Sequence, residues 1–79
     1  MHFVYSLRSK NNPEIYYIGI TGNIDRRLEE HANGQCAHTN KDKPWILIAY
    51  VAFQEKSKAV QFERYLKGGS GRAFAKRHF

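Results

Sequence analysis

The sequence has 79 residues, enough for one small domain, and we expect a single unit over residues 1–79. Hydrophobic residues make up 42% of the chain and charged residues 25%, a composition that excludes an intrinsically disordered chain. The formal net charge of +6 comes from residues 41–79, with nine basic and three acidic side chains, which favours a nucleic-acid surface over a merely solvated basic tail.

Two strands joined by a turn are predicted first. The stretch "FVYSLRS" alternates, with Phe3, Tyr5 and Leu7 on one face, and "IYYIGIT" returns after the turn residues "SKNNPE". Tyr17 and Gly19 share a face of the second strand, so antiparallel pairing could place Tyr5 and Tyr17 on the same side of the sheet. Gly19 weakens a strand unless something approaches its backbone.

A helix with both ends marked follows in "NIDRRLEEHANG". Asn23 is the expected N-cap and Gly34 the expected stop. Arg27 and His31 lie four residues apart beside the apolar stripe, so their side chains are expected one above the other. His31 is expected at the boundary of the core.

The second half of the chain predicts a third strand and two helices. "WILIAYVAF" has almost no polar residue, which is typical of a strand covered on both faces. "SKAVQFERYLKGG" predicts a helix that Gly68 and Gly69 end, and "GRAFAKRH" predicts a short basic helix.

Cysteine usage and hydropathy indicate where the protein works. Cys36 is the one cysteine, so it cannot form an internal disulfide, and this suits a reducing cytoplasm. The N-terminus lacks a signal-peptide pattern, and no apolar run approaches the length of a membrane span. We therefore expect a soluble cytoplasmic protein that binds neither membrane nor a small-molecule cofactor.

Glu63 is the sharpest anomaly in the pattern. It falls within the helical stripe formed by Ala59, Phe62 and Leu66. An acid on a core face is costly unless a cation or hydrogen-bond donors meet it. A divalent metal or a fixed arginine such as Arg27 could do so; alternatively Glu63 lies just off the core and reaches solvent.

The other polar candidates have two interpretations each. Arg27 either lays its stem along the core or directs a guanidinium at a phosphate, whose geometry it matches. Tyr5 and Tyr17 either pack within the sheet or act on a substrate, and a phenol needs a nearby cation to act as a base at neutral pH. A zinc site of His31, Cys36 and His38 is a weak alternative, because their spacing matches no recognised ligand pattern.

Taken together, these residues resemble the GIY-YIG endonuclease family, most closely its small single-domain bacterial members. The first motif is degenerate, "FVY", and keeps only Tyr5; the second, "YIG" at 17–19, is intact. Arg27 in "DRRLEEH" matches the family's arginine, and Glu63 matches its metal-binding glutamate. The likeness covers nearly the whole chain and includes "KPW" before the third strand and the basic C-terminus.

The resemblance implies an α+β fold, a three-stranded antiparallel sheet flanked by helices, and hydrolysis of DNA phosphodiesters with one Mg²⁺ or Mn²⁺ ion. It implies that Glu63 holds the metal and that Arg27 neutralises charge on the scissile phosphate. Tyr5 would position or deprotonate the attacking water, with Tyr17 hydrogen-bonded nearby. Which tyrosine is the base stays open. Cleavage would leave a 5′ phosphate and a 3′ hydroxyl.

One departure from the family concerns catalysis. Several members have a lysine just after the second motif, which lowers the pKa of the tyrosine; here the position is Ile20. His31 is a candidate to take part of that role. If it does not, low or absent activity is expected.

The substrate is less determined than the chemistry. We expect DNA, single-stranded or structured, to contact the following residues: Gly19, Arg26, Lys67, Arg72, Lys76 and Arg77. RNA and the oligomeric state stay open. The main alternative is a non-catalytic nucleic-acid-binding module of the same fold, and a third is a domain whose basic tail docks on an acidic protein.

Overall fold

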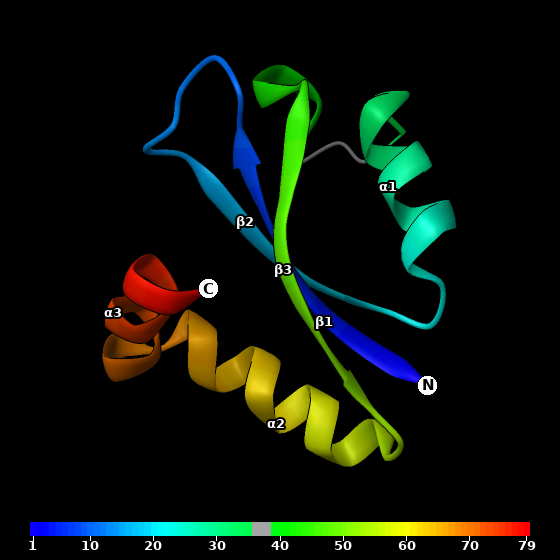
Figure 1. Ribbon diagram of the computed structural model, residues 1–79, viewed down its shortest axis with the longest axis vertical. Coiled ribbons are helices and arrows are strands. Elements are labelled where there is room, and N and C mark those ends of the chain that lie inside the picture. The colour runs from blue at the N-terminus through cyan, green and yellow to red at the C-terminus, as the bar shows by residue number, and fades with distance from the viewer. Residues whose placement is uncertain (36–38) are drawn as a thin grey trace.

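The computed structural model describes residues 1–35 and 39–79. Over these residues the strands β1 (His2–Ser9), β2 (Tyr16–Thr21) and β3 (Trp45–Phe53) form one sheet in the order β2-β1-β3. Helix α1 (Ile24–Ala32) and the short 3₁₀ helix η1 (Asn40–Asp42) connect β2 to β3, and α2 (Lys56–Lys67) and α3 (Gly69–His78) follow (Figure 1). The predicted three-stranded antiparallel sheet flanked by helices is confirmed.

The register of β1 against β2 confirms the predicted placement of the two tyrosines. Tyr5 lies opposite Gly19, and Leu7 lies opposite Tyr17. Because directly opposed residues point to the same side of a sheet, Tyr5 and Tyr17 share a face. Their ring centroids are 6.3 Å apart.

Helices cover the two faces of the sheet unequally. On one face α2 and α3 pack on β1 and β2, and α1 lies on the other face, where it approaches Tyr5 (Figure 1). The core beneath α2 and α3 is a cluster of five buried residues: Val4, Ile18, Ala59, Leu66 and Ala75. The helical stripe predicted for α2 is therefore the stripe that the helix buries.

The ends of the helices follow the predicted caps. The Asn23 side chain accepts a hydrogen bond of 3.1 Å from the backbone N–H of Arg26 and begins α1. Gly34, with φ of 73°, follows the end of that helix in the left-handed region that glycine tolerates best. Gly68 caps α2 after Lys67, whereas Gly69, which was predicted to end α2 as well, is the first residue of α3. Within the described residues, none of the helices is both long and apolar enough to cross a membrane.

The prediction that β3 is covered on both faces is wrong. Ile46, Ile48 and Tyr50 are 47%, 45% and 51% exposed. The order of the strands explains this: β1 is the central strand and is buried on both faces, whereas β3 lies at an edge, away from most of the cover that α2 provides. A register shift opposite Ser6 and Leu7 also interrupts the alternation of β3.

Candidate active site

The hydroxyl of Tyr5 is the centre of a buried polar group. It lies 2.8 Å from Nε2 of His31, and Nε of Arg27 donates to it over 3.3 Å. The side chain of Tyr5 is completely buried, and the His31 residue is 1% exposed. Strand β1 therefore supplies the phenol, and successive turns of α1 supply the guanidinium and the imidazole that meet it.

His31 is held from both sides of its ring, which contradicts its predicted place at the core boundary. Nδ1 lies 2.8 Å from the hydroxyl of Thr39, and the Thr39 carbonyl accepts a hydrogen bond of 2.8 Å from the Trp45 indole. Burial, and secondarily the Arg27 charge, lower the pKa of His31 below 6.5, while Glu30 opposes this shift. The imidazole is therefore neutral near pH 7 and has one nitrogen able to accept a proton.

Tyr17 completes the aromatic wall of the group. Its ring centroid lies 5.2 Å from that of His31 in an edge-on arrangement. Unlike Tyr5, Tyr17 is only half-buried, and the residue borders a hollow of about 370 Å³ beside β2. Tyr17 is therefore the more exposed of the two tyrosines, whereas Tyr5 is enclosed.

Gly19 makes room for a side chain of the site itself. A β-carbon at position 19 would collide with the hydroxyl of Tyr5 and would lie 2.9 Å from Cε2 of Tyr17. The sequence pattern indicated a close approach at this glycine, by substrate or by the arginine helix. The group that approaches is the Tyr5 phenol.

A carboxylate on α1 also holds the Arg27 guanidinium, through a nitrogen other than the Nε that contacts Tyr5. Arg27 Nη1 donates to Glu30 over 2.9 Å, in an ion pair whose side chains are 34% and 31% exposed. Arg26, the neighbouring arginine, has a side chain that is 71% exposed and lies 4.0 Å from the same glutamate. Of the two arginines, Arg27 is therefore the one aimed at the tyrosines.

Comparison with known proteins identifies the family of the chain. The model of the GIY-YIG catalytic domain matches residues 1–77. The chain belongs to the GIY-YIG family. The predicted class of enzyme, a GIY-YIG-type nuclease, is thereby confirmed at the level of the family.

Relatives occur among fungal and bacterial proteins. The chain is 42% identical over 71 residues to the structure-specific endonuclease subunit SLX1 of Debaryomyces hansenii, with 81% of the chain and 20% of that protein covered. It is 38% identical over 67 residues to a UPF0213 protein of Halalkalibacterium halodurans, with 84% and 69% covered. The solution structure of that bacterial protein superimposes with a TM-score of 0.57 at 34% identity, covering 95% of this chain and 79% of that one. The chain thus spans about a fifth of the fungal subunit.

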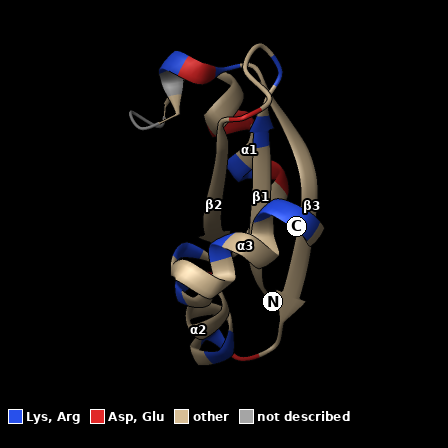
Figure 2. Ribbon diagram, turned by 90° about the vertical axis from the view of Figure 1, so that its left-hand side faces the viewer, with Lys and Arg blue, Asp and Glu red and all other residues tan. Residues whose placement is uncertain are grey.

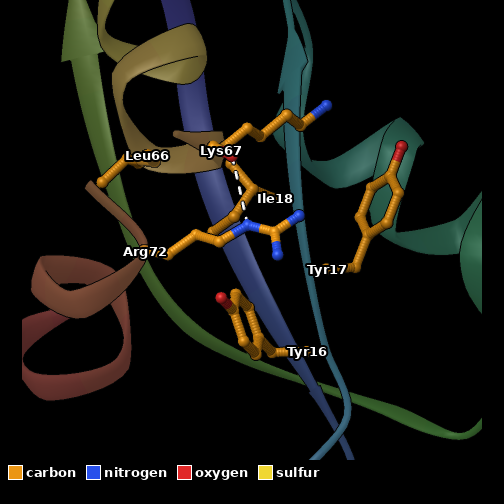
Figure 3. Close-up of a pocket in the computed structure, with 6 residues that line it drawn as sticks. All are labelled: Tyr16, Tyr17, Ile18, Leu66, Lys67 and Arg72. Carbon is orange, nitrogen blue, oxygen red and sulfur yellow. Dashed lines mark hydrogen bonds between the residues drawn. The ribbon is translucent and has the colours of Figure 1, made fainter. Parts of the chain in front are cut away.

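Glu63, which the resemblance predicts to hold the metal, lies on α2 one turn before Lys67, a residue that lines the hollow at Tyr17. Its side chain is 19% exposed and pairs with Lys67 over 3.3 Å, so the side chain that meets it here is a lysine and not the predicted Arg27. Lys67 and Tyr17 line the same hollow (Figure 3). Among the described residues, no group of three or more His, Cys, Asp and Glu side chains could hold a metal.

The predicted nucleic-acid contacts fall in different places. Lys67, Arg72 and Lys76 line two hollows beside β2, whereas Arg77 and Arg26 are exposed and line neither. Lysines and arginines recur along α2 and α3, and α3 has no acidic residue (Figure 2). The basic face therefore lies on the side of the sheet opposite α1.

Position 20, where some GIY-YIG members have lysine, lies away from the tyrosines. Ile20 packs against the core cluster on the face opposite Tyr5 and Tyr17. His31 is the residue that contacts both tyrosine rings. Of the weak zinc alternative, Cys36 and His38 lie outside the described residues.

Two residues of interest were missed in the sequence. Thr39 follows the helix after a polar loop, and nothing in that loop indicates that its hydroxyl returns to His31. Arg8 lines one of the two hollows, on the same face of β1 as Ser6 and opposite Tyr16. Because side chains alternate between the faces of a strand, the sequence alone could have placed Arg8 on the same face as Val4 and Ser6.

Proposed function

We propose that this chain hydrolyses DNA phosphodiester bonds as a metal-dependent endonuclease. The observation that carries the proposal is the Tyr5 hydroxyl, which lies between the Arg27 guanidinium and a neutral His31 with Tyr17 alongside. A buried constellation of this kind, in a chain of the GIY-YIG family, supports phosphate chemistry more than packing.

The two tyrosines have separate roles in this proposal. When the neutral His31 ring carries its proton on Nδ1, facing Thr39, the Tyr5 hydroxyl donates a hydrogen bond to Nε2. The Tyr5 oxygen then accepts a hydrogen bond from Arg27. Tyr5 thereby positions Arg27, which neutralises charge growing on the scissile phosphate. Tyr17, the less buried of the two tyrosines, orients the attacking water and assists its deprotonation.

The donor set at Glu63 fits one Mg²⁺ or Mn²⁺ ion. These ions take oxygen ligands, and Mg²⁺ is usually held by one or two carboxylates together with waters and substrate phosphates. Glu63 offers a partly exposed carboxylate whose partner, Lys67, is itself half-exposed and able to move away. Bound there, the metal would stabilise the leaving oxygen. Lys67 would then be available to a phosphate.

The test is cleavage of labelled single-stranded, duplex and branched DNA with Mg²⁺, Mn²⁺ or EDTA. Wild type, Glu63→Gln and Glu55→Gln are compared, because Glu55 is an exposed carboxylate at the start of the same helix and makes no side-chain capping bond. We expect metal-dependent cutting by wild type and Glu55→Gln only. Equal cutting by all three would contradict the assignment of the metal to Glu63.

The complete burial of Tyr5 favours a second candidate, a nucleic-acid-binding module that does not cut. Such a module would bind DNA with an affinity that falls steeply with salt, and it would tolerate Glu63→Gln. Salt-sensitive binding without cleavage under any metal condition would favour this candidate over the endonuclease.

A further inference from the structure

Arg8 on β1 has an unused hydrogen-bond donor. Its Nε is buried, and no acceptor for it is present in the described part of the chain. A buried donor of a charged group is costly to leave without a partner, so such a group indicates a missing acceptor. An anion is the acceptor that a guanidinium binds most strongly.

The surroundings of Arg8 are those of an anion site. A hollow of about 660 Å³ is lined by Arg8 together with six other residues: Pro13, Glu14, Tyr16, Arg72, Ala73 and Lys76. Three cations from β1 and α3 thus meet one carboxylate, that of Glu14 in the exposed loop before β2. The net charge of the lining is positive.

This hollow continues toward the candidate active site. Tyr16 and Arg72 also line the hollow that contains Tyr17 and Lys67. Arg72 Nε donates to the carbonyl of Lys67 over 3.1 Å, which fixes the guanidinium beside both hollows (Figure 3). The two hollows therefore adjoin at Tyr16 and Arg72, and Figure 3 shows the ring of Tyr17 on the other side of β2.

We propose that Arg8, Arg72 and Lys76 bind a second phosphate of the nucleic-acid substrate, on the face of the sheet opposite Tyr5. The inference rests on the proposed function, because continuity with the hollow at Tyr17 is what identifies the anion as a nucleic-acid phosphate. The nucleic-acid strand would pass from the hollow at Tyr17 and Lys67, along Tyr16 and Arg72, to Arg8. The phosphate is either an internal diester or a terminal monoester, and both offer the oxygens that Arg8 lacks.

Matched pairs of variants test the site by binding alone. Arg8→Gln is compared with Lys10→Gln, and Lys76→Gln with Arg77→Gln, because each control removes the same charge from an exposed neighbour that lines neither hollow. Thermal unfolding establishes that each variant folds. Binding of short fluorescent single strands, with a 5′ phosphate or a 5′ hydroxyl, is measured in EDTA over a range of salt concentrations.

We expect Arg8→Gln and Lys76→Gln to raise Kd about tenfold and to lower the salt slope by about 0.7, the contribution of one phosphate contact on a single strand. The controls should stay within about twofold. A loss confined to the 5′-phosphorylated strand would identify a terminal phosphate, and an equal loss on both strands an internal one. Equal losses in variants and controls would overturn the site.

The two proposals fail separately. Binding in EDTA does not require catalysis. A selective loss of binding in Arg8→Gln, without any cleavage by wild type, would therefore support the phosphate site and contradict the endonuclease proposal. Cleavage by wild type with no difference between variants and controls would do the reverse. If Arg8→Gln does not fold, the phosphate site is tested by comparing Lys76→Gln with Arg77→Gln, because both are exposed positions on α3.

Discussion

Tyr5 and Gly19 lie directly opposite each other in the β1–β2 pair, and the Tyr5 phenol fills the space that a side chain at position 19 would need. The glycine of "YIG" thus allows the phenol to lie across the neighbouring strand and reach His31 on α1. The backbone of β2 is therefore part of the support of the site.

Gly19→Ala should destabilise the protein and disturb the site. The new methyl group would overlap the Tyr5 hydroxyl, and overpacking of this kind costs about 1–3 kcal/mol. Gly22→Ala is the matched control, because a β-carbon there has no neighbour within 4 Å and its backbone is not in the left-handed region. Urea unfolding measures both variants; an equal stability of Gly19→Ala and wild type would contradict the assigned packing.

His31 predicts a pH dependence of stability. Its pKa is lowered in the folded protein from the unfolded value of 6.5, so near and below that value the unfolded state binds more protons. The stabilisation is therefore present above pH 6.5 and is lost as pH falls through the folded pKa. Urea unfolding from pH 8 down to pH 5 measures it.

The variant His31→Gln should reduce that pH slope, and His78→Gln, which alters an exposed imidazole on α3, should leave it unchanged. Identical slopes in wild type and His31→Gln would show that another group titrates in this window.

Much of the fold could be predicted because its signals are local. The alternation of β1 and β2 placed Tyr5 and Tyr17 on one face, and Asn23 and Gly34 marked the ends of α1. These features depend on the period of a strand and on the chemistry of caps, which neighbouring residues determine.

What could not be predicted depends on packing between distant elements. The same apolar sequence suits a central or an edge strand, so the exposure of β3 follows from the strand order and the placement of helices. His31 resembled a boundary residue because Thr39 and Tyr5, which enclose it, belong to other segments. The partner of Glu63 was open for the same reason.

The edge position of β3 predicts a tolerant surface. Ile48→Thr keeps a β-branched side chain at a site that is 45% exposed, and it should change the free energy of unfolding by less than about 0.5 kcal/mol. Leu66→Ala, in the completely buried core, should cost about 2–5 kcal/mol. Unfolding by urea compares the two. A cost for Ile48→Thr as large as that for Leu66→Ala would mean that β3 is covered in solution.

The division of roles between the tyrosines predicts two different phenotypes. Tyr17→Phe keeps the ring against His31 and should leave Tm unchanged, while it lowers the cleavage rate by about 10²-fold or more, the usual contribution of a positioned acid or base. Tyr5→Phe leaves a buried imidazole nitrogen without its partner, so it should lower stability by about 1–3 kcal/mol as well as activity.

Tyr50→Phe, at an exposed position of β3 that lines neither hollow, is the control for loss of a tyrosine hydroxyl. Cleavage rates and Tm are measured for all three variants. If Tyr17→Phe cuts at the wild-type rate while Tyr5→Phe is inactive with an unchanged Tm, the roles must be exchanged. The enclosed phenol would then be the base, and the site would have to open before water could reach it.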